Sequence, residues 1–366
     1  MNLSTNRRRF IQGTSAIAAG AMSFKFGRAA AASPGEVTVA LNGGDYAKAC
    51  IEAFVKPFEA ETGIKVNPIT DQIQTSKLEL MVTTNTVSVD VVPVFPNFDI
   101  LAAEKGYLEK IDYSIYKQDE LDAILDFTRT PHSVGAIVYA YCMVYNTEKF
   151  PAGKPRPSSW SEFWDTTKFP GVRTLPSGQN GEVPLEEALL ADGVPAETIY
   201  PIDIDRAFAS LDKIKPHIRK WWATGSEVQQ MMHDKVVDLA QSYDGRAITL
   251  IEEGAPLEVN RNQQKITWEG WGIPKGSANV QNAQRFIEFI TRAERQAAFA
   301  KLMPFGPANR NAYKLLPEDA GRKFAGHPDY VKSSIVLDPK WYAEAGSDGL
   351  TNLDRVIQRW NGWVLQ

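Results

Sequence analysis

The sequence GAIVYAYCMVYN, residues 135–146, is rich in Val, Ala and Tyr and predicts one long β-strand. Shortly after it, residues 151–159 contain three prolines and one glycine, which neither a sheet ladder nor a helix can accommodate. A strand of this length can run from one lobe of a protein into another. The chain has 366 residues, well above the ~150 typical of one domain. We therefore predict two lobes, with the boundary near residue 144.

On the N-terminal side of this strand, strand and helix patterns alternate. Residues 37–41 predict a strand that ends at Asn42, and a helix follows from Asp45 to about residue 62. Residues 65–69 predict a second strand and 72–83 a second helix. The apolar run 89–95 predicts a third, parallel strand, followed by a helix over 99–105. Ligands of such α/β sheets bind beyond the carboxyl ends of strands, here residues 43–46 and 96–98.

On the C-terminal side the alternation continues, which makes the whole fold α/β. We expect strands over residues 172–175, 218–222 and 236–241, and helices over 160–167, 184–190, 204–214, 225–233 and 247–253. Residues 257–260 are expected to lead through a polar turn into a strand that begins at Ile266. One long amphipathic helix is expected over 279–301, and a C-terminal helix near 353–363.

The first 32 residues are predicted to be a cleaved export signal. Arg7, Arg8 and Arg9 precede Phe10, a weakly apolar run follows, and small residues close the segment. Paired arginines of this kind resemble the twin-arginine signal, so the export machinery that reads it is an expected partner. The apolar run is shorter than the ~18–20 residues that span a bilayer. We expect the mature chain to reside in the periplasm.

Composition narrows the functional classes. Loss of the signal's five basic residues moves the net charge from −4 to −9, which disfavours nucleic-acid binding and suits a cationic ligand. Cys50 and Cys142 are expected to be two buried thiols, although an oxidising compartment permits one disulfide. The four histidines lack ligand spacing, so no metal site and no cofactor are predicted.

Residues 268–274, WEGWGIP, place the carboxylate of Glu269 between Trp268 and Trp271 on a strand that leads into a loop. An ammonium group gains roughly 0.5–2 kcal/mol against an aromatic face, and a carboxylate neutralises its charge. The same alternation also permits two core tryptophans with Glu269 in solvent. The stretch alone leaves both interpretations open.

Several short motifs, in this order, resemble those of the solute-binding proteins of ABC importers, in particular the spermidine/putrescine-type receptors. They are FEAETGIKV (58–66), VDVVPV (89–94), GYLEKID (106–112), PSSW (157–160), YDG (243–245), IPKG (273–276) and PAN (307–309). The resemblance implies a two-lobed type II periplasmic-binding-protein fold with ligand held in the cleft between lobes. It implies lobe 1 over residues 34–143 plus 270–314 and lobe 2 over 144–269 plus 315–366. It also implies a monomer that delivers its solute to the permease subunits and catalyses no reaction.

The resemblance carries six ligand-binding residues over to this sequence. They are Asp45, Tyr46, Phe98, Tyr243, Glu269 and Phe305, with Glu269 as the carboxylate that holds an ammonium group. Asp244 is a further candidate acid, although it could instead cap the helix that follows it.

One departure from the polyamine receptors concerns the first turn of the second lobe. Paired acids stand there in the family, whereas this chain has PSGQN over residues 176–180. A turn around Ser177 at a helix N-terminus suits an anion or a neutral polar group. The solute is therefore expected to be a polyamine or a short amino-acid-like compound, with Arg246 or Arg261 as a possible carboxylate clamp. A periplasmic hydrolase using Asp244 and Glu269, and a ferric-ion receptor of the same fold, are the alternatives.

Overall fold

The computed structural model describes residues 35–70, 73, 75–178 and 182–366. The predicted export signal and residues 179 and 180 of the predicted ligand turn lie outside these ranges. The strands are β1 (Glu36–Ala40), β2 (Lys65–Ile69), β3 (Val92–Val94), β4 (Ser133–Asn146), β5 (Arg173–Pro176), β6 (Ile218–Trp222), β7 (Leu239–Tyr243), β8 (Leu257–Gly272), β9 (Gly306–Pro307) and β10 (Ile335–Val336).

The helices follow the alternation that the sequence predicts. They are α1 (Gly44–Cys50), α2 (Lys56–Thr62), α3 (Thr75–Thr83), α4 (Pro96–Glu104), α5 (Gln118–Ala123), α6 (Trp160–Trp164), α7 (Leu185–Ala191), α8 (Ile204–Ile214), α9 (Gly225–His233), α10 (Asp244–Glu252), α11 (Val280–Ile290), α12 (Ala293–Ala300), α13 (Glu318–Gly321), α14 (Pro328–Val331), α15 (Pro339–Ala343) and α16 (Asn352–Val364). A π-helical turn over Ile51–Val55 joins α1 to α2. Among the described residues no helix is long and apolar enough to span a membrane.

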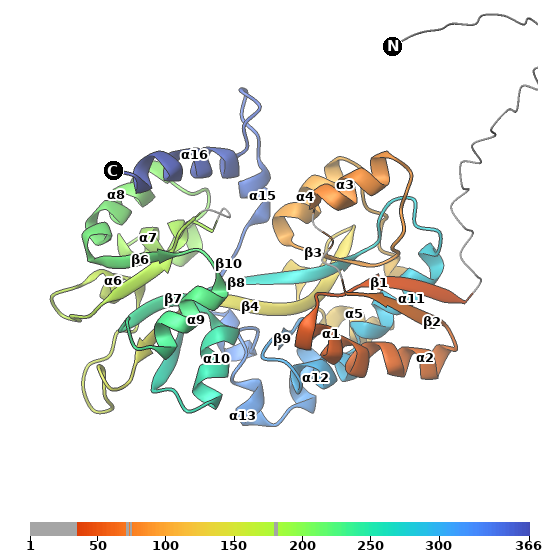
Figure 1. Cartoon of the computed structure of the whole chain (residues 1–366), viewed down its shortest axis with the longest axis horizontal. Helices are drawn as coiled ribbons and strands as arrows, with labels where there is room; N and C mark the ends of the chain where they lie inside the picture. The colour runs from red at the N-terminus through yellow and green to blue at the C-terminus, as the bar shows by residue number, and fades with distance from the viewer. Residues whose placement is uncertain (1–34, 71–72, 74, 179–181) are drawn as a thin grey trace, which may run out of the picture. The chain divides into compact units, whose positions relative to one another are not determined.

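The paired strands β4 and β8 connect the two halves of the fold (Figure 1). They run antiparallel, with Ile137 opposite Glu269 and Tyr141 opposite Lys265. On one side lies a core built mainly from residues 37–137 and 271–299, and on the other a core built mainly from residues 143–214 and 335–363. This arrangement is the predicted two-lobed α/β fold. The domain limits drawn from the sequence stay a prediction.

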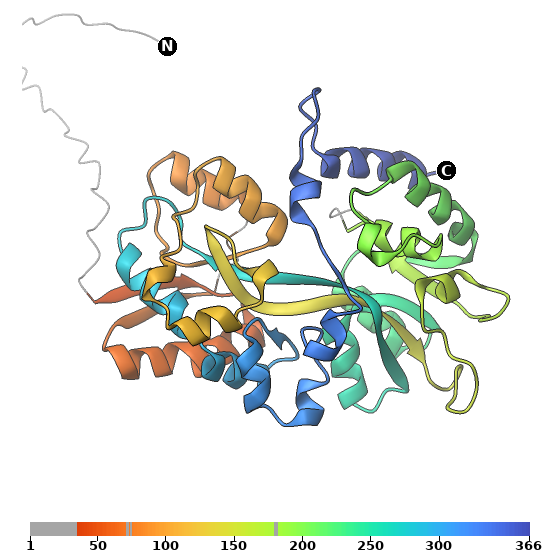
Figure 2. The same cartoon turned by 180° about the vertical axis from the view of Figure 1, so that it is seen from behind.

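The sheet that contains β4 and β8 is mixed. Its order is β10-β8-β4-β7-β5-β6, with β3 added to β8 and β9 to β4, while β1 and β2 form a separate parallel pair. Figure 2 shows the C-terminal chain crossing the paired strands before it reaches α15 and α16. Along this path β10 pairs with β8, and α15 contacts α4 from the other half.

The strand pairing corrects two predictions. The run 89–95 was expected to be a parallel strand, but β3 pairs antiparallel with β8, and Val91 alone makes a parallel bridge to Val39. Uniform apolarity reports burial on both faces and carries no information on strand direction. The polar turn expected before Ile266 is a bulge inside one continuous strand, where Gln263 takes a φ of 59°. Trp160 fixes this bulge by donating its Nε1–H to the Gln263 carbonyl at 2.9 Å.

The helix expected over residues 279–301 is two helices. Arg292 is extended, with φ −62° and ψ 144°, and separates α11 from α12. The Thr291 hydroxyl bonds back to the Ile287 carbonyl at 3.0 Å, while the Ala293 N–H donates to Glu120 at 3.0 Å. Tertiary partners of this kind override a continuous amphipathic pattern. Similarly, β7 extends to Tyr243, and α10 begins at Asp244 rather than at Ala247.

Candidate functional site

The middle of the β4–β8 pair forms the floor of a cavity of about 1260 Å³. Successive residues of a strand point to opposite faces, so alternate positions share one face. On β4 these positions are Ile137, Tyr139 and Tyr141, and on β8 they are Lys265, Thr267 and Glu269, all of which line the cavity. Glu269 lies four residue steps along β8 from Lys265, which sets their Cα atoms ~13 Å apart.

Glu269 is a buried carboxylate at one end of this floor, with 4% of its surface exposed. Its Oε1 accepts a hydrogen bond from the Tyr46 hydroxyl at 3.2 Å and a longer one from Asn42 Nδ2 at 3.5 Å. Within the described ranges it forms no ion pair with Lys, Arg or His. Burial raises the pKa of Glu269 from 4.5 to about 7, although both hydrogen bonds act to lower it. A carboxylate held in this way favours a cation that the solute itself would supply.

Aromatic rings surround this carboxylate, but they are not the tryptophans that flank it in sequence. Trp271 packs into the core of the first half, and Trp268 packs against Phe127 on the opposite face of β8. Tyr46 and Phe305 meet edge to face with ring centroids 6.2 Å apart, and Tyr139 lies 6.5 Å from Phe305. The predicted residues Tyr46, Phe98, Tyr243 and Phe305 all line the cavity. Their ligand-binding roles stay a prediction.

The cavity lining also includes a carboxylate that was not predicted from the sequence. The Tyr243 hydroxyl donates to the two oxygens of Glu182 at 2.6 and 2.7 Å, and both residues line the cavity. Tyr139 and Tyr141 also line it and were missed, with centroids 6.1 and 4.8 Å from Tyr243. The alternation of Tyr139 and Tyr141 on the long strand was a usable signal. Glu182 had none, because neither strand alternation nor a sequence motif marks it.

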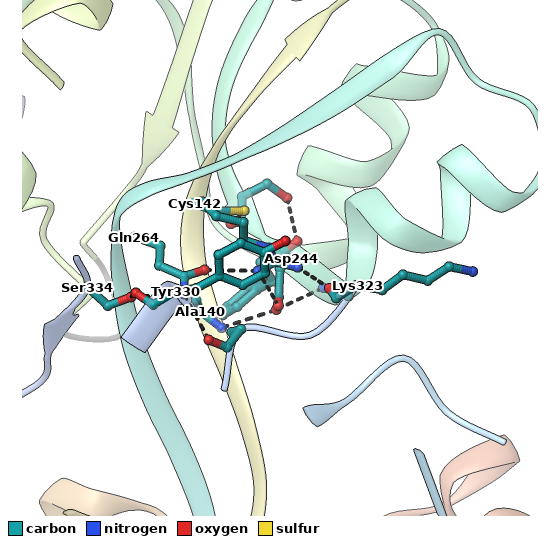
Figure 3. Close-up of polar contacts among 12 residues, drawn as sticks. Ala140, Cys142, Asp244, Gln264, Lys323, Tyr330 and Ser334 are labelled. Atoms are coloured by element: carbon teal, nitrogen blue, oxygen red, sulfur yellow. Dashed lines mark hydrogen bonds and ion pairs between the residues drawn. The ribbon is translucent and has the colours of Figure 1, made fainter. Parts of the chain in front are cut away.

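Asp244 lines the cavity, but its charge is already neutralised inside the protein. Its Oδ2 pairs with Arg261 Nη1 at 2.8 Å, and the two side chains are 3% and 10% exposed. Its Oδ1 accepts from the backbone N–H of Ala140 at 3.1 Å (Figure 3) and of Gly245 at 3.0 Å. Asp244 therefore joins the start of α10 to β4 and β8, and it is poorly placed to act with Glu269 as an acid–base pair.

Arg261 extends this network to the C-terminal chain, so it is not a free carboxylate clamp. It donates to Gln264 Oε1 at 3.0 Å and to the Lys323 carbonyl. Gln264 in turn donates to Ser334 Oγ at 3.0 Å (Figure 3). The network holds the β8 bulge, α10 and residues 323–334 together.

Arg246 offers a cation on the cavity wall. It is exposed, lines the cavity, and donates from Nη1 to the neutral Gln229 Oε1 at 3.0 Å. In the part of the chain that the structure describes, no carboxylate forms an ion pair with it. Of the two arginines considered from the sequence as carboxylate clamps, Arg246 is therefore the one whose charge remains available to a solute.

Lys265, at the far end of the floor, is already paired. Its ammonium contacts Glu186 Oε2 at 2.8 Å and Glu187 Oε2 at 3.2 Å, and all three side chains are buried. Burial raises the pKa of Glu187 to about 7, whereas for Glu186 the effect of burial is exceeded by the Lys265 ammonium and the hydrogen bonds to this carboxylate together, which lower its pKa. The hydroxyls of Tyr200 and Tyr342 both donate to Glu186, at 2.7 and 2.8 Å. A solute anion would have to compete with these acids for Lys265.

Two predicted residues take more peripheral positions. Asp45 lines the cavity, but its carboxylate is 84% exposed and pairs with Lys48 at 2.8 Å. Ser177 is buried and does not contribute to the described cavity lining, while its backbone N–H donates to the Trp222 carbonyl at 2.7 Å. Their ligand-binding roles stay a prediction.

Two further observations concern the cysteines and the side chains that could bind a metal ion. Cys50 and Cys142 are free and buried, in agreement with the expected thiols. The described residues contain no group of three or more His, Cys, Asp or Glu side chains that could hold a metal ion.

The fold and this cavity define a class: two-lobed proteins that enclose a small solute between their halves. The chain belongs to the bacterial extracellular solute-binding proteins, whose family description matches residues 53–324. It is similar to a gamma-aminobutyric acid-binding protein of Pseudomonas aeruginosa, with 30% identity over 93% of this chain and 94% of the relative. It is therefore a substrate-binding protein of the kind that serves ABC transporters.

Solved structures agree with this membership. A substrate-binding protein of an ABC transporter from Bradyrhizobium japonicum is 29% identical, with a TM-score of 0.79, and covers 90% of this chain and 99% of its own. A GABA receptor is 31% identical, with a TM-score of 0.77, over 90% and 97% of the two chains. The spermidine/putrescine-binding periplasmic protein of Escherichia coli is more distant, at 23% identity over 80% of this chain and 84% of its own. The family prediction is thus confirmed at the coarser level, and its polyamine subtype is not.

Proposed function

We propose that this protein captures a small zwitterionic amino acid of the 4-aminobutyrate type and delivers it to an ABC importer. The observation that carries the proposal is Glu269, a buried carboxylate that lines the cavity and has no cationic partner among the described residues. Leaving such a charge unpaired is costly, and an incoming ammonium group would remove that cost. The family membership supports binding, rather than catalysis, as the function of this carboxylate.

The ammonium end of the solute would lie against Glu269 and the rings around it. Tyr46, Tyr139 and Phe305 present aromatic surface at this end of the cavity, where the Tyr46 hydroxyl already orients the carboxylate. Aromatic faces attract a cation most strongly where water is excluded. This end of the site therefore combines charge neutralisation with cation–π attraction.

The carboxylate end would be received by Arg246. Its charge faces the cavity without an acidic partner in the described chain, and its guanidinium fork matches a carboxylate in geometry. The two ends are close in the fold: a Cβ built on Gly245, next to Arg246, would lie 3.7 Å from the Phe305 ring, and Phe305 packs on Tyr46 beside Glu269. The Glu269 carboxylate and the Arg246 guanidinium, both lining one cavity, together complement a zwitterion. The relatives that bind gamma-aminobutyric acid support this choice.

A diamine such as putrescine is the second candidate, and Glu182 is the observation that favours it. Its carboxylate lines the same cavity as Glu269 and receives hydrogen bonds from the Tyr243 hydroxyl. Two acids facing one cavity could hold two ammonium groups. The two candidates differ in which residue, Arg246 or Glu182, binds the far end.

The remaining parts of the proposal concern location and partners. The predicted signal would send the chain to the periplasm through the twin-arginine machinery, as a monomer. Closure of the two halves around the solute, about the β4–β8 crossing, would create the surface that the permease subunits recognise.

Titration calorimetry of the purified protein with 4-aminobutyrate and with putrescine tests the proposal. Arg246→Gln should weaken 4-aminobutyrate binding by roughly 10-fold or more, the worth of a charge-assisted hydrogen bond, and should spare putrescine. Arg285→Gln, an exposed position on α11, is the matched control and should change neither affinity. The diamine would be the solute instead if putrescine bound more tightly, Glu182→Gln abolished that binding, and Arg246→Gln had no effect.

A further inference from the structure

Two amide oxygens in the cavity wall, those of Asn42 and Asn97, accept no hydrogen bond from any described residue. Asn42 Oδ1 and Asn97 Oδ1 are both buried and without a partner among the described residues, and both asparagines line the cavity. Asn42 directs its Nδ2 toward Glu269 Oε1 at 3.5 Å, which leaves its oxygen for another donor. Buried carbonyl oxygens are nearly always hydrogen-bonded in folded proteins. Two exceptions in one cavity wall indicate groups prepared for a ligand.

The strand topology brings these oxygens to the same edge as the carboxylate. Asn42 follows β1 and Asn97 follows β3, and the two chain segments run side by side because Val39 bridges Val91 in parallel. β3 is in turn paired with β8, with Val94 opposite Gly270, the residue after Glu269. Three neighbouring chain segments therefore present three acceptors at one end of the cavity.

We propose that Glu269, Asn42 and Asn97 form a three-acceptor cradle that selects a primary ammonium group over N-methylated amines. The inference rests on the proposed function and specifies the solute class at the same site. A primary ammonium group carries three N–H donors, one for each acceptor. Every methyl group on the nitrogen removes one donor and leaves a buried acceptor unpaired, while the positive charge is unchanged.

The aromatic walls alone would produce the opposite preference. Tyr46, Tyr139 and Phe305 would attract a quaternary ammonium at least as well as a primary one, since aromatic surfaces are the usual receptors of such groups. The orphan amide oxygens are what separates the two ligand classes. A trimethylated nitrogen would cover both oxygens and offer a donor to neither.

The test is calorimetric titration of the full mature chain at pH 8 with four ligands. These are 4-aminobutyrate, its N-methyl and N-trimethyl derivatives, and 4-aminopentanoate. The last is an isomer of the N-methyl compound that carries its extra methyl on carbon and keeps three N–H donors. We expect affinity to fall about 10-fold for each N–H that is lost, and 4-aminopentanoate to bind more tightly than the N-methyl isomer.

Substitutions test whether Asn97 is responsible for the preference for a primary ammonium group. Asn97→Leu should weaken 4-aminobutyrate about 10-fold and reduce the preference over the N-methyl compound, whereas Asn361→Leu, exposed on α16, should change neither. Equal affinity of wild-type protein for the two isomers, or tight binding of the trimethyl compound, would overturn the cradle while leaving the proposed function intact. If no compound of the series binds, the proposed function fails and the cradle fails with it. The comparison of 4-aminopentanoate with the N-methyl isomer on wild-type protein tests the cradle even if a variant does not fold.

Discussion

Replacing Glu269 by glutamine should stabilise the empty protein and weaken solute binding. Burial raises the pKa of this carboxyl from 4.5 to about 7, so the folded state holds a proton that the unfolded state releases. The free energy of unfolding therefore falls by 1.36 kcal/mol per pH unit as pH rises from 4.5 to 7, and is level above that. The total loss is on the order of 3 kcal/mol at pH 8. The glutamine variant does not ionise and should avoid it.

The same substitution removes the partner of the solute's ammonium. A hydrogen bond to a charged group contributes about 1.5–3 kcal/mol, which corresponds to a loss of roughly 10- to 150-fold in affinity. Tyr46 and Asn42 can still donate to the amide oxygen of the variant, so the cavity should keep its shape. Stability and binding should thus change in opposite directions.

Thermal unfolding at pH 8, with and without 4-aminobutyrate, measures both effects. The empty variant should unfold several degrees above the wild type, and added ligand should raise its midpoint less than that of the wild type. Glu104→Gln, an exposed acid on α4, is the control and should leave both quantities unchanged. A variant that melts below the wild type at pH 8, or that binds 4-aminobutyrate equally well, would refute the reasoning about Glu269.

Three further predictions concern the pH dependence of binding, the Asp244–Arg261 ion pair and the backbone at Gly178. Affinity for 4-aminobutyrate should fall about 10-fold per pH unit below 7, because protons compete with the solute for Glu269; a flat calorimetric profile from pH 5 to 8 would contradict this. Arg261→Met should lower the free energy of unfolding in urea by about 3–5 kcal/mol, because it leaves Asp244 buried and unpaired, and adding Asp244→Asn should recover part of the loss. Gly178→Ala should lower the thermal midpoint, with a cost of about 1–3 kcal/mol, since φ is +66° and the new methyl would lie 2.8 Å from Trp360; an unchanged midpoint would argue against this strain.

Much of the fold follows from the sequence because its signals are local. Strand β2, helix α8 and strand β6 have the predicted limits, and Thr224 caps α9 by accepting from the Glu227 N–H as its sequence position indicates. The long strand at residues 135–146 is the connection between halves, as its length suggested. Such elements depend on residues close in sequence, which a single chain reveals.

The errors arose where distant partners decide the local structure. Placing Gln263 in a bulge requires knowing that Trp160 binds it, and ending α11 at Ile290 requires knowing where Glu120 lies. Strand direction at β3 is likewise set by its neighbour β8. None of these relations leaves a periodic signature in the sequence.

The site was predictable to the extent that strand ends and alternation define it. Seven of the eight predicted residues line the cavity, with Ser177 outside the described lining, but the ion pair of Asp244 with Arg261 was not foreseeable from sequence. Pairing decides which charged residue remains available to a solute, and pairing is a property of three-dimensional proximity. That is why Arg246 and Glu182 gain weight only in the folded structure.

The most direct test of the central claim is the crystal structure of the complex with 4-aminobutyrate. The account predicts the solute nitrogen within hydrogen-bonding distance, about 2.7–3.2 Å, of the Glu269 carboxylate, with the solute carboxylate against Arg246. A solute bound in the reverse orientation, or one whose nitrogen contacts no oxygen of Glu269, would contradict it.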